Sequence, residues 1–287
     1  MWMLGSATGL SIIGLLGKLI EVKMHLPALI FWRFFTAFFI CLFVLWCMGK
    51  LRGGFRTGNI KMHLLRTFFV LSAQYCFFSY IQQNTLLNAI VLLNTGPLFI
   101  PIIDCLILKK RVGRSTWIGV AVSFIGVLFI LQPGSGIFSA MSLIGLLAGL
   151  SQGASQIVFG MSSTSERSEL SVLYLLFLCA FLSLFPYLFL ESSAWKGDVV
   201  DKIQVFYLMG GLGAASLANQ LFRAEAYQHG TPSRLASFLY FSVLLGGILD
   251  FAVYGKVPNA LSIVGAFLVV LGGVLKIYIR RLILKNK

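Results

Sequence analysis

Long apolar runs separated by short polar connections alternate along the whole chain. Each run holds roughly 18 to 24 residues, enough for a helix to cross a hydrocarbon core about 30 Å thick. The pattern therefore predicts ten transmembrane helices. They are placed at residues 3–20, 28–48, 64–82, 85–108, 116–132, 139–162, 170–190, 203–224, 235–254 and 260–279.

Composition supports this interpretation. Hydrophobic residues make up 58% of the 287 positions and charged residues only 11%, with a mean hydropathy of +0.91. Soluble domains carry about 25% charged residues. The fold class we predict is an all-α membrane protein, and the connections leave no room for a separate soluble domain.

The net charge of +14 would fit a nucleic-acid-binding protein, but its distribution favours another reason. Most Lys and Arg residues fall in the connections on one side and near the C-terminus, for example Lys109 to Arg114. Cytoplasmic loops carry such an excess. We expect a multi-pass protein of a bacterial-type cytoplasmic (inner) membrane with both termini cytoplasmic, anionic lipids as partners on that side, and no nucleic-acid partner.

The second half of the chain repeats the first. Near the start of each half, a shift of 140 positions aligns "GSATGLS" with "GLLAGLS", and further along a shift of 146 positions aligns Asp104 with Asp250 without a gap. The same alignment pairs Gln82 with Gln228, Thr85 with Thr231, Lys110 with Lys256, Gly119 with Gly265 and Gly126 with Gly272. We expect two repeats, residues 1–138 and 139–287, in one membrane domain. Each holds an odd number of helices, five, so the second repeat must be inverted. Inverted repeats are typical of secondary transporters, in which two similar halves exchange conformations around a central site.

Several stretches resemble a known family. They are "NTGPLFIPIIDCLILKKRVGRSTWIGVAVSFIGV", "YFSVLLGGILDFAVYGKVPNALSIVGAFLVVLGG", "FWRFFTAFF" and "FRAEAYQHGTPSRLASFLY". Together they resemble the EamA family of the drug/metabolite transporter superfamily, over nearly the whole chain. The resemblance implies two five-helix units and the transport of amino acids or related metabolites. Where that family usually has Glu after the fourth and ninth helices, this chain has Lys110 and Lys256, which we interpret as helix C-terminal caps or contacts to lipid phosphates.

Neutral polar residues near the middle of the predicted helices are the candidate substrate ligands. Gly145, Gly149, Gln152 and Gln156 share one helical stripe, and their small and amide side chains suit a central cavity. Interhelical hydrogen bonding is the alternative role. The cavity candidates are mostly neutral, so we expect few fixed charges in the site. The predicted substrate-binding residues are Gln152, Gln156, Gln74, Tyr75, Asn94, Asn219 and Tyr240.

Ionisable and proline residues within the helices are candidates for gating or coupling. Asp104 and Asp250 lie near helix ends, where they suit a gate network or proton coupling. Arg33 is expected near the outer face, and Arg223 with Glu225 at the interface, where Glu225 can pair with His229. Prolines in the fourth helix predict a kink that serves either as a hinge or as a static bend. The gating set is Asp104, Asp250, Arg33, Pro97 and Pro101.

No phosphate-binding loop, dinucleotide fingerprint or metal-ligand spacing appears, and the five Cys residues fit packing roles. We expect no cofactor, no metal and no catalytic residue. The predicted function is secondary active transport of a small polar metabolite, an amino acid or related compound, by a monomer or homodimer. The alternatives are an exchanger of S-adenosylmethionine or another nucleoside-bearing metabolite, an intramembrane lipid-modifying enzyme that uses Asp104 with Lys109, and a passive channel.

Overall fold

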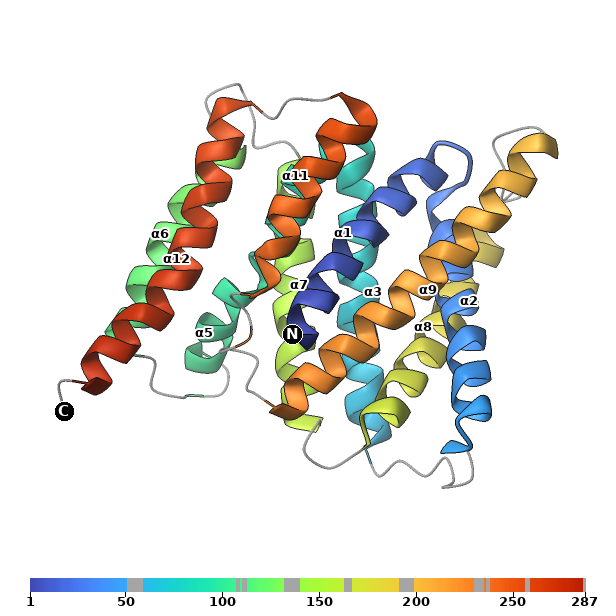
Figure 1. Cartoon of the computed structure of the whole chain (residues 1–287), viewed down its shortest axis with the longest axis horizontal. Coiled ribbons are helices and arrows are strands. Elements are labelled where there is room, and N and C mark those ends of the chain that lie inside the picture. The colour runs from blue at the N-terminus through green and yellow to red at the C-terminus, as the bar shows by residue number, and fades with distance from the viewer. Residues whose placement is uncertain are drawn as a thin grey trace.

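The structure, a computed structural model, describes the chain except residues 51–58, 107–108, 110–112, 132–139, 163–166, 191–198, 230–234, 236–237, 256–258 and 286–287. The elements that it describes form a bundle of helices (Figure 1). They are α1 (Trp2–Glu21), α2 (Leu26–Cys47), α3 (Ile60–Gln83), α4 (Leu86–Leu93), α5 (Gly96–Leu106), α6 (Arg114–Leu131), α7 (Ala140–Ser162), α8 (Ser168–Leu190), α9 (Val199–His229), α11 (Phe241–Tyr254) and α12 (Ala260–Lys285).

The predicted all-α class is confirmed, and each predicted span overlaps helix in the described residues. Six helices, α1, α2, α3, α7, α8 and α9, are long and apolar enough to cross a membrane. Four further apolar segments are shorter by the same measure: Leu86–Ile100, Trp117–Phe129, Phe241–Tyr254 and Ala260–Gly272. The protein is an integral membrane protein.

The outward faces of the helices are apolar. On α8, Phe177, Phe181 and Phe185 follow one another at a spacing of four, so they form one stripe, and each is about half exposed. Neighbouring rings contact one another along the stripe, with centroids 6.3 and 5.6 Å apart. A soluble protein rarely exposes so much apolar surface. Lipid is the environment that suits this face.

Helices from the two halves pack in reciprocal pairs. α1 lies along α9 and α3 lies along α7, while α6 packs on α12, α2 on α8, and α4 on α11. Figure 1 shows that α1 runs upward in the view and α7 downward. α1 and α7 are the first helices of the two halves, and α3 and α9 are the third. In both the α1–α9 pair and the α7–α3 pair, the first helix of one half therefore packs against the third helix of the other.

Glycines bring α6 and α12 into close contact at matched positions. A methyl group added to Gly126 would lie 2.6 Å from the carbonyl oxygen of Gly265, and one added to Gly272 would lie 2.5 Å from that of Gly119. These are the four glycines that the sequence alignment pairs. Small residues allow helix backbones this approach in membranes.

The fourth predicted helix is two helices. α4 ends at Leu93 and α5 begins at Gly96, one residue before Pro97. A proline lacks the N–H that would bond to the carbonyl one turn earlier, so an interruption at this point follows from the sequence. Thr95 donates its hydroxyl hydrogen to the Leu92 carbonyl at 2.6 Å, which occupies an acceptor at the break. The hinge role of Pro97 and Pro101 remains a prediction.

Candidate functional site

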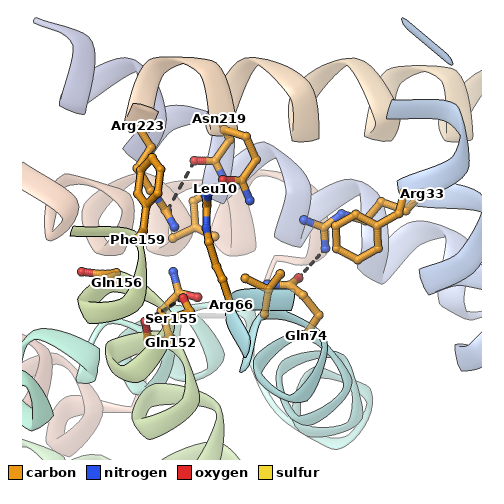
Figure 2. Close-up of a pocket in the computed structure, with 13 residues that line it drawn as sticks. Leu10, Arg33, Arg66, Gln74, Gln152, Ser155, Gln156, Phe159, Asn219 and Arg223 are labelled. Carbon is orange, nitrogen blue, oxygen red and sulfur yellow. Dashed lines mark hydrogen bonds between the residues drawn. The ribbon is translucent and has the colours of Figure 1, made fainter. Parts of the chain in front are cut away.

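A polar pocket lies inside the bundle, between helices of both halves (Figure 2). α1, α2 and α3 contribute from the first half, and α7 and α9 from the second. Its lining residues are Leu10, Arg33, Phe34, Arg66, Val70, Gln74, Gln152, Ser155, Gln156, Phe159, Asn219, Gln220 and Arg223. The space that a water-sized sphere can occupy with its centre is about 20 Å³. A cavity needs on the order of 10–15 Å³ by this measure to hold one water, so in this conformation the pocket is narrow and has room for about one water.

Four of the predicted substrate ligands line this pocket, namely Gln74, Gln152, Gln156 and Asn219. The residues of the helical stripe on α7 lie in two different surroundings. Gly149 and Gly145 pack against residues of α4 and the break that follows it, while the two glutamines, one to two turns further along, face the pocket.

The other three predicted ligands lie elsewhere. Asn94, at the break between α4 and α5, donates its amide hydrogen to the Ser242 hydroxyl at 2.7 Å, and so joins the two halves. Tyr240, which precedes α11, is buried, at 2% exposure. Tyr75 is half-buried and packs against the hydrophobic core.

Arg33 is buried in the bundle interior, at 3% exposure. Its Nε donates to the Ser216 hydroxyl at 2.8 Å, and its Nη1 donates to the side-chain oxygen of Gln74. Its guanidinium also lies 5.1 Å from the ring centroid of Phe34. Arg33 of α2 therefore makes interhelical hydrogen bonds to α9 and α3 at the pocket wall.

Arg66 is a pocket residue that the sequence reasoning did not single out. α3 begins at Ile60, so Arg66 lies in its second turn, and its side chain is only 3% exposed. Its Nη1 donates to the Ser171 hydroxyl at 3.0 Å, and its guanidinium carbon lies 3.7 Å from the ring centroid of Phe159. The sequence held a signal: Arg66, Val70 and Gln74 follow at spacings of four, on one face.

Arg223, expected at the interface, is a buried residue of the pocket wall. α9 continues to His229, which leaves Arg223 at 6% exposure inside the bundle. Its Nε and Nη2 approach the Ser6 hydroxyl and the Asn219 side-chain oxygen, each at 3.4 Å. The predicted pairing of Glu225 with His229, one turn on, is confirmed at 3.8 Å.

The pocket is cationic, which corrects the expectation of few fixed charges. Three arginines line it, and no carboxylate is among its lining residues in the part of the chain that the structure describes. Figure 2 shows the side chains of Arg66 and Arg223 extending toward Asn219, with Arg33 reaching Gln74 on the other side of the view. Arg223 is close enough to both other arginines for their positive charges to repel.

Two amide atoms of the pocket glutamines are also without a hydrogen bond. Among the described residues, Gln156 Nε2 and Gln220 Oε1 are buried and have no partner. The other amide atom of Gln156, Oε1, accepts from the Tyr227 hydroxyl at 3.2 Å. Buried polar atoms are normally paired, so these two mark positions where a ligand or water completes the site.

Asp250 lies in a second polar cluster, where α11 meets α1 and α4. Its carboxylate is 1% exposed, accepts from Lys18 Nζ at 3.3 Å and accepts from the backbone N–H of Leu87 at 3.0 Å. Lys18 also donates to the Asn84 carbonyl at 3.3 Å. The repeat-related Asp104 lies on α5 with a side chain outside the described set, and Lys110 and Lys256 lie outside the described residues.

Comparisons with known proteins agree with this architecture. A crystal structure with a TM-score of 0.67 and 16% sequence identity covers 96% of this chain and 96% of its own, which shows a shared fold. A riboflavin transporter of Vibrio cholerae is 27% identical over 94% of this chain and 90% of its own. A pseudopaline exporter of Pseudomonas aeruginosa is 26% identical, covering 74% and 73%. An S-adenosylmethionine uptake transporter of Rickettsia prowazekii is 21% identical, covering 100% and 94%.

The model of the EamA-like transporter family matches twice, over residues 1–132 and 139–278. The two matches together take in nearly all of the chain, including the helices that line the pocket. The chain belongs to the EamA-like transporter family.

Proposed function

We propose that the protein is a secondary active transporter that carries a small polar metabolite by alternating access, with the pocket among α1, α2, α3, α7 and α9 as its substrate site. One observation carries the proposal: a buried polar pocket whose walls come from both halves of a membrane-embedded bundle. Rocking of one half against the other would open such a pocket to one side and then to the other.

The relation between the halves supports this mechanism. The reciprocal helix pairs, the matched glycines of α6 and α12, and the opposite directions of α1 and α7 are what two inverted repeats, residues 1–138 and 139–287, would produce. Two similar halves give two packings of similar energy, which alternating access requires.

Interrupted helices support it further. The helix is interrupted at Asn94, between α4 and α5. In the second half, Tyr240 aligns with Asn94, and α11 begins directly after it. Transporters use discontinuous helices beside the substrate site, where their ends absorb changes in backbone angle. Asn94 and Ser242 hold the two interruptions together in the present conformation.

The Lys18–Asp250 pair is proposed as a gate. It joins α1 to α11, and through the Leu87 N–H it also joins α4, at the end of the bundle where α1 ends. With both termini in the cytoplasm, as the distribution of Lys and Arg predicts, this end faces outward. The pair then closes the outer entrance, and Asp104 remains a candidate for coupling.

The remaining alternatives carry less support. The sequence predicts an amino acid or related compound as the substrate, with S-adenosylmethionine as the alternative; the charge of the pocket bears on both and is considered below. A lipid-modifying enzyme would rest on Asp104 and its basic neighbours, and the relatives named above are transporters. A passive channel would need a continuous wide path, whereas the pocket is narrow, at about 20 Å³.

Counterflow into proteoliposomes tests the proposal. Vesicles containing the purified protein are loaded with a mixture of amino acids, organic acids and phosphate esters, and exchange against the same labelled mixture is followed by mass spectrometry. Saturable exchange of at least one compound, absent from protein-free vesicles, is expected. No exchange of any compound, or uptake that does not saturate, would contradict a carrier.

A further inference from the structure

The three arginines of the pocket are held by neutral groups alone among the described residues. Their hydrogen-bond acceptors are the hydroxyl oxygens of Ser216, Ser171 and Ser6 and the amide oxygens of Gln74 and Asn219. The ion pairs of the described residues join other groups, Lys18 with Asp250, Lys50 with Glu169 and His229 with Glu225. The hydrogen bonds occupy donors, but they leave three positive charges uncompensated.

An uncompensated buried charge is one of the costliest features a folded protein can hold. The Phe159 ring beside Arg66 offsets part of that cost, since the face of an aromatic ring attracts a cation. The mutual repulsion of Arg223 with Arg33 and Arg66 adds to it. Three such groups around one pocket therefore indicate that the charges have a role in binding at another step of the transport cycle.

The hydrogen-bond donors that remain free in the pocket indicate which kind of ligand it binds. A guanidinium carries five N–H groups, and Arg66 uses one of them in hydrogen bonds within the described structure, while Arg33 and Arg223 use two each. Gln156 Nε2 is a further donor without a partner. Carboxylate and phosphate oxygens accept several hydrogen bonds each, and the planar guanidinium matches them with two parallel bonds.

Resting on the proposed function, we infer that the transported solute is a small organic anion whose oxyanion group, carboxylate or phosphate, binds among Arg33, Arg66 and Arg223. The anion supplies the missing negative charge, and Gln152, Gln156 and Gln220 bind its uncharged part. A solute with a net positive charge would add to the repulsion. Zwitterionic amino acids bring one carboxylate together with an ammonium group, so solutes with two or more negative charges suit the pocket best.

Matched pairs of compounds test the charge requirement by binding. The unfolding temperature of the purified full-length protein in detergent is measured with succinate against succinamide, and with glycerol 3-phosphate against glycerol. A ligand that binds the folded state raises this temperature. We expect a rise with at least one of the two anions and none with its neutral counterpart, and the two pairs separate carboxylate from phosphate recognition. Equal rises within the pairs, or no rise with either anion, would overturn the inference.

Arginine variants test where the anion binds. Arg66→Gln removes the charge but keeps an amide donor. Arg66→Lys keeps the charge but loses the paired N–H donors of the planar guanidinium. Arg167→Gln, which removes an exposed arginine, is the control. We expect Arg66→Gln to weaken anion binding by at least about 30-fold, as loss of a buried charged contact does. Arg66→Lys is expected to weaken it less, and Arg167→Gln not at all.

The ligand-free variants distinguish binding from a structural role. Because an uncompensated charge destabilises the empty protein, Arg66→Gln should unfold at the same or a higher temperature than the wild type when no anion is present. A lower temperature with the anion-induced rise retained would assign Arg66 a structural role and overturn the inference. Arg223→Gln is tested in parallel with the same expectations, so that poor folding of one variant does not decide the result.

The inference and the proposed function fail separately. Proteoliposomes that exchange succinamide or glycerol but not the anions would support the proposed transport function and contradict the inference of an anionic solute. The opposite result is anion binding in detergent that is lost in Arg66→Gln, with no exchange of any anion in proteoliposomes. This result would support the anion-binding site and contradict the transport function.

Discussion

Lys18 and Asp250, from opposite halves of the chain, form a buried ion pair with Nζ and Oδ1 3.3 Å apart. Lys18 is 11% exposed and Asp250 1%. The pair also joins a third helix, because the second carboxylate oxygen accepts from the Leu87 N–H. Replacing one member of such a pair leaves the other charge buried alone.

The first prediction concerns the stability of this pair. Asp250→Asn should destabilise the protein by about 3–5 kcal/mol, read as a lower unfolding temperature in detergent, while the double variant Lys18→Met with Asp250→Leu should lose less. Lys50→Met serves as the control, since its partner Glu169 lies in a more exposed pair that contributes ~1 kcal/mol or less. Equal losses for Asp250→Asn and Lys50→Met would show that the pair does not hold the helices together.

The second prediction separates two glutamines of the pocket. Gln152 has no side-chain hydrogen bond among the described residues, whereas Gln156 accepts from Tyr227. Gln152→Ala should therefore leave the unfolding temperature unchanged, and Gln156→Ala should lower it, since a buried hydroxyl loses its acceptor at a cost of about 1–3 kcal/mol.

Both glutamine variants should bind the transported solute less tightly, by about fivefold for each hydrogen bond lost. The half-saturation concentration for exchange in proteoliposomes measures this. Unchanged transport kinetics in both variants would remove these amides from the substrate site.

The third prediction concerns the contact between α6 and α12. Gly126→Ala should lower the unfolding temperature, at a cost of about 1–3 kcal/mol, because the added methyl group would lie 2.6 Å from the Gly265 carbonyl oxygen. Gly210→Ala in α9 is the matched control. A methyl group there meets nothing within 4 Å, so the better helix propensity of Ala should stabilise the protein by up to about 1 kcal/mol. Similar effects of the two substitutions would argue against the close contact.

The fourth prediction concerns the mode of transport. If the three pocket arginines need an anion, the empty carrier has to reorient with its charges uncompensated, and it should do so slowly. Exchange of a bound anion should then exceed its net efflux by at least about tenfold, the factor that ~1.4 kcal/mol of additional barrier gives. Labelled efflux into buffer with and without the unlabelled anion measures the ratio. A ratio near one would show that the empty site reorients freely.

Hydrophobic patterning predicted the helices because a membrane demands long apolar segments wherever the chain crosses. The internal alignment paired the four glycines that lie at the contact between α6 and α12, but it did not predict that they meet. A position near the middle of the predicted helices singled out the amides of Gln74, Gln152, Gln156 and Asn219, and the structure brings these four to one pocket.

The arginines were harder to place from the sequence. Arg66 and Arg223 lie close to helix ends, and near an end the sequence alone does not separate a residue at the lipid interface from one that points into the bundle. The direction depends on how the neighbouring helix is rotated, and this is set by packing against helices distant in sequence. Asn94 and Tyr240 were predicted as ligands too, but the amide of Asn94 bonds to Ser242 at an interruption of the helix, and Tyr240 lies outside the pocket.

Access to the pocket tests the central claim most directly. Ser155 lines the pocket and is 4% exposed, so Ser155→Cys, in a protein whose five native cysteines are replaced, places a reporter thiol there. A membrane-impermeant thiol reagent is applied to right-side-out and to inside-out vesicles, with Phe124→Cys on the outer face of α6 as the lipid-facing control. Alternating access predicts reaction of the pocket thiol from both sides, with a shift toward the outer side in Asp250→Asn, whose gate is weakened. Reaction from one side only, unaltered by Asp250→Asn, would contradict it.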